Sequence, residues 1–98
     1  MPAAKEKRSA YTFDDKLAQE LKDRVDNNIS IPLKPREIGY RLLPDYYGSD
    51  VIDVLVILPK SFKVDDMSYD DTVLLKKTIR TWTARKFPSF TNMFSFDQ

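Results

Sequence analysis

The segment 50–58 (DVIDVLVIL) limits the folds open to this chain more than any other stretch. Alternate residues of a strand point to opposite faces, and here both sets are apolar apart from Asp53. A strand that is apolar on both faces is usually central in its sheet or covered on both sides. We therefore expect a sheet in which this strand is central and both faces are covered by other parts of the chain or by a partner. The strand is expected to end at Pro59.

Residues 37–43 (EIGYRLL) predict a second strand, because apolar side chains at alternate positions share one face and Arg41 points to the other. The segment 44–49 that follows (PDYYGS) has turn chemistry and predicts a hairpin loop. Residues 29–33 and 60–64 could add short edge strands. For 29–33, Pro32 within the stretch and Pro35 just after it remove ladder donors and leave an extended linker as the alternative.

A first helix is predicted over residues 13–26. Thr12 is expected to cap its start, with Asp14 and Asp15 in the first turn near the positive end of the helix dipole. The two asparagines at 27–28 are expected to end it, because Asn tolerates the left-handed conformation found at helix termini. Its apolar side chains recur every four residues and form one stripe, namely Phe13, Leu17, Leu21 and Val25, with Ala18 beside them.

A second helix is predicted over residues 69–86. Ser68 provides the cap, and Asp70 and Asp71 follow in the first turn, an arrangement close to a capping box. Pro88 stops the helix, because the residue before a proline is pushed out of the α region. The apolar stripe of this helix consists of Leu75, Ile79 and Trp82, extended by the stem of Lys86.

These elements stand in the order α-β-β-α, so the expected fold class is α+β. We expect a small antiparallel sheet of two to four strands, with an N-terminal and a C-terminal helix packed on it. A flexible tail is expected at 1–10, a single domain over 11–88 and an aromatic C-terminal tail at 89–98. That tail or a partner is expected to cover the sheet face that the helices leave open. No family is identified; the order of elements alone is similar to several small viral joining proteins and to the double-stranded-RNA-binding domain, whose loop motifs are not found here.

The 98 residues include neither Cys nor His. This excludes disulfides, thiolate nucleophiles and cysteine zinc sites, and it removes the commonest general base. The two glycines, Gly39 and Gly48, cannot form a Gly-rich phosphate loop of either common pattern. We therefore expect a protein that is not an enzyme and that has no cofactor, no metal and no small-molecule substrate.

Sixteen basic and 15 acidic residues give a net charge of +1, far from the balance of a dedicated nucleic-acid domain. The longest apolar run, residues 54–58, is too short to span a bilayer, and residues 1–10 lack the apolar region of a secretory signal. The expected location is the cytoplasm, with no membrane partner.

The terminal stretch 87–98 contains four of the six phenylalanines and a single charge. Burying one Phe side chain is worth about 1.5–3 kcal/mol, so these rings should pack either on their own domain or on another chain. The leading hypothesis is a non-enzymatic protein-binding module, that is, an assembly, adaptor or inhibitory subunit that binds a protein partner or a second copy. The predicted partner-binding residues are Tyr46, Tyr47, Phe90, Met93, Phe94 and Phe96.

The alternative hypothesis is a nucleic-acid-binding protein that uses a basic face of the second helix. Cations on one helix face could bind backbone phosphates, although a solvated face explains the same residues. The candidates are Lys76, Lys77, Arg80 and Arg85.

A cluster of carboxylates near the start of the second helix does not predict a metal site. It lacks the central Gly and closing Glu of a calcium loop, and helix capping accounts for two of its four members. Asp45 and Asp53 suggest a two-carboxylate nuclease only weakly, because no lysine follows two residues after the second; Asp53 is expected on the less buried face of its strand. The cluster is Asp65, Asp66, Asp70 and Asp71.

Overall fold

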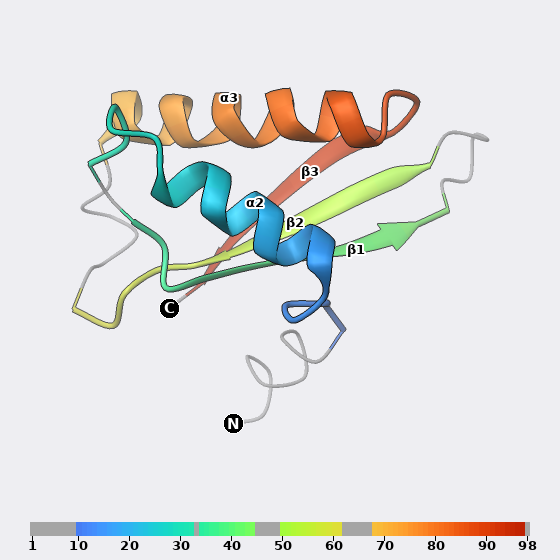
Figure 1. Ribbon diagram of the computed structural model, residues 1–98, viewed down its shortest axis with the longest axis horizontal. Coiled ribbons are helices and arrows are strands. Elements are labelled where there is room, and N and C mark those ends of the chain that lie inside the picture. The colour runs from blue at the N-terminus through green and yellow to red at the C-terminus, as the bar shows by residue number, and fades with distance from the viewer. Residues whose placement is uncertain (1–9, 33, 45–49, 62–67, 98) are drawn as a thin grey trace.

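The computed structural model describes residues 10–32, 34–44, 50–61 and 68–97 of the chain. The strands in these ranges form one sheet in the order β1-β2-β3. Figure 1 shows both helices on the same side of this sheet, α2 in contact with β1 and α3 in contact with β3. The elements in chain order are α2 (Lys16–Asp26), β1 (Glu37–Leu43), β2 (Val51–Ile57), α3 (Tyr69–Lys86) and β3 (Thr91–Asp97).

The strand β2 is central, as its two apolar faces predict. It pairs antiparallel with β1, where Val54 is opposite Tyr40, and parallel with β3, where Val54 lies beside Phe94. All of its residues from Ile52 to Ile57 are buried. The strands predicted at 37–43 and 50–58 are thereby confirmed, the second with one residue fewer at each end.

The expected element order and the all-antiparallel sheet are wrong. The order is α-β-β-α-β, and the sheet is mixed, because residues 91–97 of the expected aromatic tail form a third strand. The helix α3 returns the chain to the end of the sheet where β2 began, so β3 runs parallel to β2 as in other β-α-β units. In the sequence, the alternation of Phe94 and Phe96 with smaller residues was too short to be distinguished from a tail.

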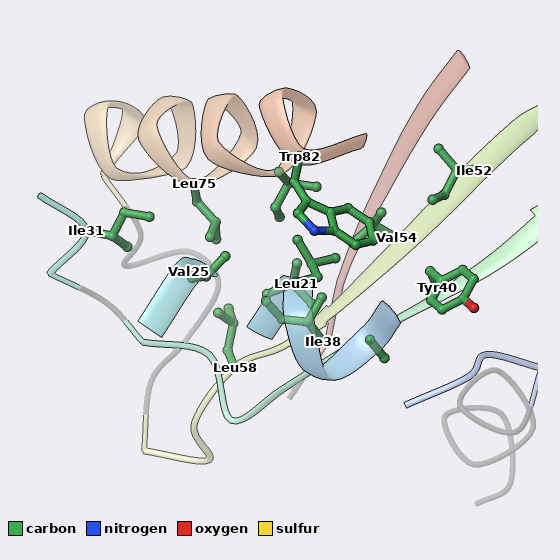
Figure 2. Packing of buried hydrophobic residues seen from close by; sticks show 13 residues of the cluster. Leu21, Val25, Ile31, Ile38, Tyr40, Ile52, Val54, Leu58, Leu75 and Trp82 are labelled. Atoms are coloured by element: carbon green, nitrogen blue, oxygen red, sulfur yellow. The ribbon is translucent and has the colours of Figure 1, made fainter. Parts of the chain in front are cut away.

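The main core lies between the helices and the sheet (Figure 2). Leu21 and Val25 from α2 meet Leu75 and Trp82 from α3 over Val54 of β2, and each of these side chains is at most 1% exposed. The apolar stripes predicted for both helices from Leu17 onward therefore face the core. The second helix also has the predicted bounds and cap, since the Ser68 side chain accepts a hydrogen bond from the Asp71 amide.

The helices are joined at this core by the Glu20 carboxylate of α2. The Trp82 indole N–H donates to Glu20 Oε2 at 2.7 Å, and Lys86 Nζ lies 3.0 Å from the same oxygen. The hydrogen bond from Lys86, with that from Trp82 as a second cause, holds the pKa of Glu20 below its usual value. The C-terminal end of α3 is thus fixed to α2 through the Glu20 side chain.

The second face of the sheet is covered by residues that precede α2, not by the aromatic segment. Tyr11 packs with Leu55 and Ile57 in a separate small cluster, and Phe13 lies against it. Phe13 also lies over Gly39, where an added Cβ would approach the Phe13 ring to 2.7 Å. Phe13 was expected in the stripe of the first helix, and that expectation is wrong.

Thr12 pairs with the edge of β1 and does not cap the helix. Its amide donates to the Tyr40 carbonyl at 2.8 Å, and the Tyr40 amide donates back to the Thr12 carbonyl at 3.1 Å. The helix α2 therefore begins at Lys16, with Asp15 as its cap through a 2.8 Å bond from the Ala18 amide. The predicted start at residue 13 is wrong because this backbone pairing takes the residue that would otherwise cap.

The helix α2 ends at Asp26 as predicted, with Asn27 as its C-cap, but the left-handed conformation expected there is not adopted. Asn27 stays in the right-handed region, with φ of −86° and ψ of −4°. The amides of Asn27 and Asn28 donate to the carbonyls of Asp23 and Val25, and Lys34 Nζ donates in addition to the carbonyl oxygens of Val25 and Asn28. Neither 29–32 nor 60–61 forms a strand, while residues 33 and 62–64 of the two proposed edge strands lie outside the described ranges.

Asp53 is buried at 2% exposure, which corrects its expected place on a less buried face. Its Oδ2 accepts hydrogen bonds from the Tyr11 hydroxyl at 2.6 Å and from Arg41 Nε at 2.9 Å. The Arg41 guanidinium also lies 4.7 Å from the centroid of the Tyr11 ring. Burial, with the bond to Asp53 as a second cause, raises the pKa of Tyr11, whereas the bond to Asp53 raises the pKa of Arg41.

Candidate functional site

The structure brings together the two groups of residues that the sequence offered as separate sites. Phe94 and Phe96 lie on β3, and the basic residues Lys76 and Arg80 lie on the side of α3 that faces them. The predicted Tyr46 and Tyr47 fall outside the described residues, as does Asp45.

The strand β3 is the last strand of the sheet on its side. The Thr91 amide donates to the Asp50 carbonyl and the Leu58 amide donates to the Asp97 carbonyl, so both ends of β3 direct their backbone groups to β2. Because these groups alternate in direction along a strand, the amides and carbonyls of the intervening even-numbered residues point outward. Within the described ranges, these outward groups have no backbone partner. They belong to Asn92, Phe94 and Phe96.

The rings of Phe94 and Phe96 are half-buried on the helix side of the sheet. Lys76 Nζ lies 5.8 Å from the centroid of each ring, and the Arg80 guanidinium lies 5.3 Å from the centroid of Phe94. Contacts of a cation with an aromatic face are worth about 0.5–1 kcal/mol at exposed sites. The two cations are thereby held over the open edge of β3. We call these four residues, with the outward backbone groups, the β3 edge site.

Lys76 and Arg80 have no carboxylate partner in the part of the chain that the structure describes. The ion pairs found there join Lys22 with Asp26, Arg41 with Asp53 and Lys86 with Glu20. Like charges at i and i+4 on a helix repel each other by about 0.2–0.5 kcal/mol. The helix dipole does not explain the position of Lys76, because it favours cations only in the last turn.

The start of β3 is fixed to α3 by a side-chain bond. The Thr83 hydroxyl, buried at 1% exposure, donates to Asn92 Oδ1. This bond places the edge strand against the helix at the end opposite to Lys76. Nothing in the sequence pattern indicated the pairing, because Thr83 lies beside the apolar stripe and Asn92 was assigned to a tail.

Phe90 and Met93, also predicted as partner-binding residues, lie away from the β3 edge site. The Phe90 ring packs on Phe87 at 5.2 Å between centroids, and Phe87 packs on Trp82 at 6.2 Å. Phe90 therefore extends the core. Met93 alternates with Phe94 and so lies on the second face of the sheet, where it is 51% exposed.

Lys77 and Arg85, the other members of the predicted basic face, point elsewhere. Lys77 lines a groove of about 330 Å³ between the two helices, together with Arg24. Arg85 is exposed, and five positions beyond Arg80 it falls on a different side of the helix. The basic run is thus divided between separate surfaces.

No family model, curated protein or solved structure that was compared with the chain gave a match. Across the described ranges, no helix is long and apolar enough to cross a membrane. The same ranges contain no group of three or more acidic side chains placed to hold a metal ion, and Asp65 and Asp66 lie outside them. The case for a function therefore rests on the geometry of the β3 edge site.

Proposed function

We propose that this chain is a small protein-binding module that takes up an extended segment of a partner at the open edge of β3. The observation that supports the proposal is the row of outward amides and carbonyls of Asn92, Phe94 and Phe96, which have no backbone partner within the described ranges. A segment added beside β3 would bond to this row and extend the sheet, which is a recurring mode of peptide recognition.

The composition of β3 supports binding over simple exposure to water. Proteins usually protect an edge strand with lysine, proline, a bulge or very short length. The strand TNMFSFD has seven residues, a regular register with β2, and neither lysine nor proline. At the other edge of the sheet, Thr12 already occupies the backbone groups of Tyr40 on β1. The β1 edge is therefore partly paired by Thr12, whereas the β3 edge has no backbone partner within the described ranges.

The proposal changes the roles of the predicted partner-binding residues. Phe94 and Phe96 flank the added segment on the helix side, whereas Phe90 packs on Phe87 and belongs to the core. Met93 would contact only the second face of the added segment. A role for the loop with Tyr46 and Tyr47 stays a prediction from the sequence.

The nucleic-acid alternative receives less support from the geometry. Base stacking needs a free aromatic face, but Lys76 and Arg80 lie over the Phe94 and Phe96 rings. The remaining cations are divided between the groove that contains Lys77 and the surface around Arg85. The four predicted nucleic-acid-binding residues therefore do not form a continuous basic track for a phosphate backbone. They are Lys76, Lys77, Arg80 and Arg85.

A pair of substitutions at Phe96 tests strand addition. The Phe96 amide points outward, so Phe96→Pro removes a donor to the partner while the bonds to β2 remain. Phe96→Val loses the same ring but keeps the amide. Random twelve-residue peptides displayed on phage would be selected on the full chain, and the enriched peptides would be titrated against both variants by fluorescence anisotropy.

We expect the enriched peptides to lose at least tenfold more affinity with Phe96→Pro than with Phe96→Val, because only the proline blocks the edge. Circular dichroism and urea unfolding of both variants would establish that each retains the fold. Failure of the selection to enrich any peptide, or equal affinity of the two variants, would contradict strand addition at β3.

A further inference from the structure

The β3 edge site also contains information about the chemistry of its partner. We infer that the segment added at β3 is acidic, with Asp or Glu at alternate positions on the helix side of the sheet. This inference rests on the proposed strand addition and specifies which class of peptide the edge takes up.

The spacing of side chains in a sheet sets where the partner's residues would lie. In adjacent strands, side chains on one face stand about 4.5–5.5 Å apart at Cβ. Every second residue of the added segment would therefore lie beside Phe94 or Phe96. Lys76 and Arg80 contact these same rings from above, so the partner's side chains would enter the space next to both cations.

The charges at this place favour carboxylates over neutral or basic side chains. Within the described ranges, Lys76 and Arg80 have no ion-pair partner, and they repel each other as like charges one helical turn apart. Two carboxylates at positions i and i+2 of the added segment would accept charge-assisted hydrogen bonds from these cations. These carboxylates would also offset the repulsion between Lys76 and Arg80. A basic side chain in the same place would add a third positive charge.

The same charges argue against a second copy of this chain as the occupant. Antiparallel pairing of two β3 strands would bring Lys76 and Arg80 from both copies to the same face of the joined sheet. Four cations would then gather along one edge, where the strand TNMFSFD offers only Asp97, at its end. The geometry therefore favours a different protein with an acidic segment.

Reversing the charges of the site tests the inference. The peptide selection would be repeated on the full-length Lys76→Glu/Arg80→Glu variant, with Lys77→Glu/Arg85→Glu as the matched control. The control has the same change in net charge, but its residues lie on other sides of α3. Synthetic peptides would then be compared with versions in which each Asp or Glu is replaced by the corresponding amide.

On the unmodified chain we expect enrichment of Asp and Glu at alternate positions, and at least tenfold weaker binding of the amide versions. The Lys76→Glu/Arg80→Glu variant should lose the acidic peptides and enrich basic ones, while the control variant should still bind the acidic peptides. Binding to the unmodified chain should weaken as salt is added.

Several results would overturn the inference. Enriched peptides without acidic residues, or acidic peptides that bind the charge-reversed variant unchanged, would reject the acidic partner. Strand addition itself would still be decided by the comparison of Phe96→Pro with Phe96→Val. A dimer seen by light scattering that Phe96→Pro abolishes and Phe96→Val retains would make a second copy the occupant. Binding of a polythymidine oligonucleotide in preference to the acidic peptides, lost on Lys76→Glu/Arg80→Glu, would assign the cations to nucleic acid.

Discussion

Asp53 fixes the segment before α2 to the second face of the sheet. Its Oδ2 accepts from both Tyr11 and Arg41, and among the described residues its Oδ1 has no partner. Hydrogen bonds to a charged group are worth about 1.5–3 kcal/mol, so Asp53→Ala should lower the free energy of unfolding by about that amount. Urea unfolding at pH 7 would measure the loss. The control is Asp50→Ala, at the exposed position just before β2, which should change stability by less than about 0.5 kcal/mol.

An equal effect of the two alanine variants would show that the hydrogen bonds of Asp53 with Tyr11 and Arg41 add no net stability. The result would also test whether Tyr11 depends on Asp53, because its hydroxyl would lose its acceptor.

Tyr40 gives the fold a dependence on alkaline pH. Burial, together with its hydrogen bond to the Asp15 carboxylate, raises the pKa of Tyr40 from 10.0 to about 12. A group whose pKa is raised in the folded state stabilises it fully below the unfolded pKa, and this contribution falls as pH rises through the folded pKa. Stability should therefore decline between pH 10 and about pH 12, with Tyr11 acting in the same direction.

Tyr40→Phe should reduce the slope of unfolding free energy against pH in this window, because one of the shifted phenols is gone. Urea unfolding at several pH values from 9 to 12 would measure the slope. The matched control is Tyr69→Phe, which removes the hydroxyl of a ring that is 81% exposed. Parallel slopes for Tyr40→Phe and the unmodified chain would contradict the assignment.

At the scale of elements, the sequence predicted those whose signals are local. The α3 range follows from Ser68, its first-turn carboxylates and Pro88, all of which act within a few residues. The β2 strand follows from its apolar alternation. The start of α2 could not be predicted, because Thr12 pairs with Tyr40, which is distant in the sequence.

The strand β3 shows the same limit more clearly. A seven-residue edge strand acquires its structure from pairing with β2 and from the Thr83–Asn92 bond, and neither is visible in local propensity. For the candidate site, the sequence indicated Lys76, Arg80, Phe94 and Phe96 but placed them in two hypotheses. Only the parallel pairing of β3 brings the rings under the cations.

At the scale of the molecule, β3 is both a structural strand and the proposed binding surface. Its helix-side rings join the main core, and its inward backbone groups bond to β2. Its outward groups form the open edge of the β3 edge site. The rigidity of the edge thus depends on the same strand that completes the sheet, so a binding function and the stability of the fold are coupled.

This coupling predicts the effect of truncation. A chain ending at residue 88 would lose a third of the sheet's strands and expose the apolar side chains of Val54 and Val56, which are 0% exposed in the full chain. Since small domains are stable by only about 5–15 kcal/mol, we expect the truncated chain to lose cooperative unfolding and not merely partner binding. Thermal melts followed by far-ultraviolet circular dichroism would test this, with full-length Phe96→Val as the folded control. A truncated chain that melts cooperatively near the temperature of the full chain would mean that the terminal segment is a detachable tail, and the open edge would then belong to β2.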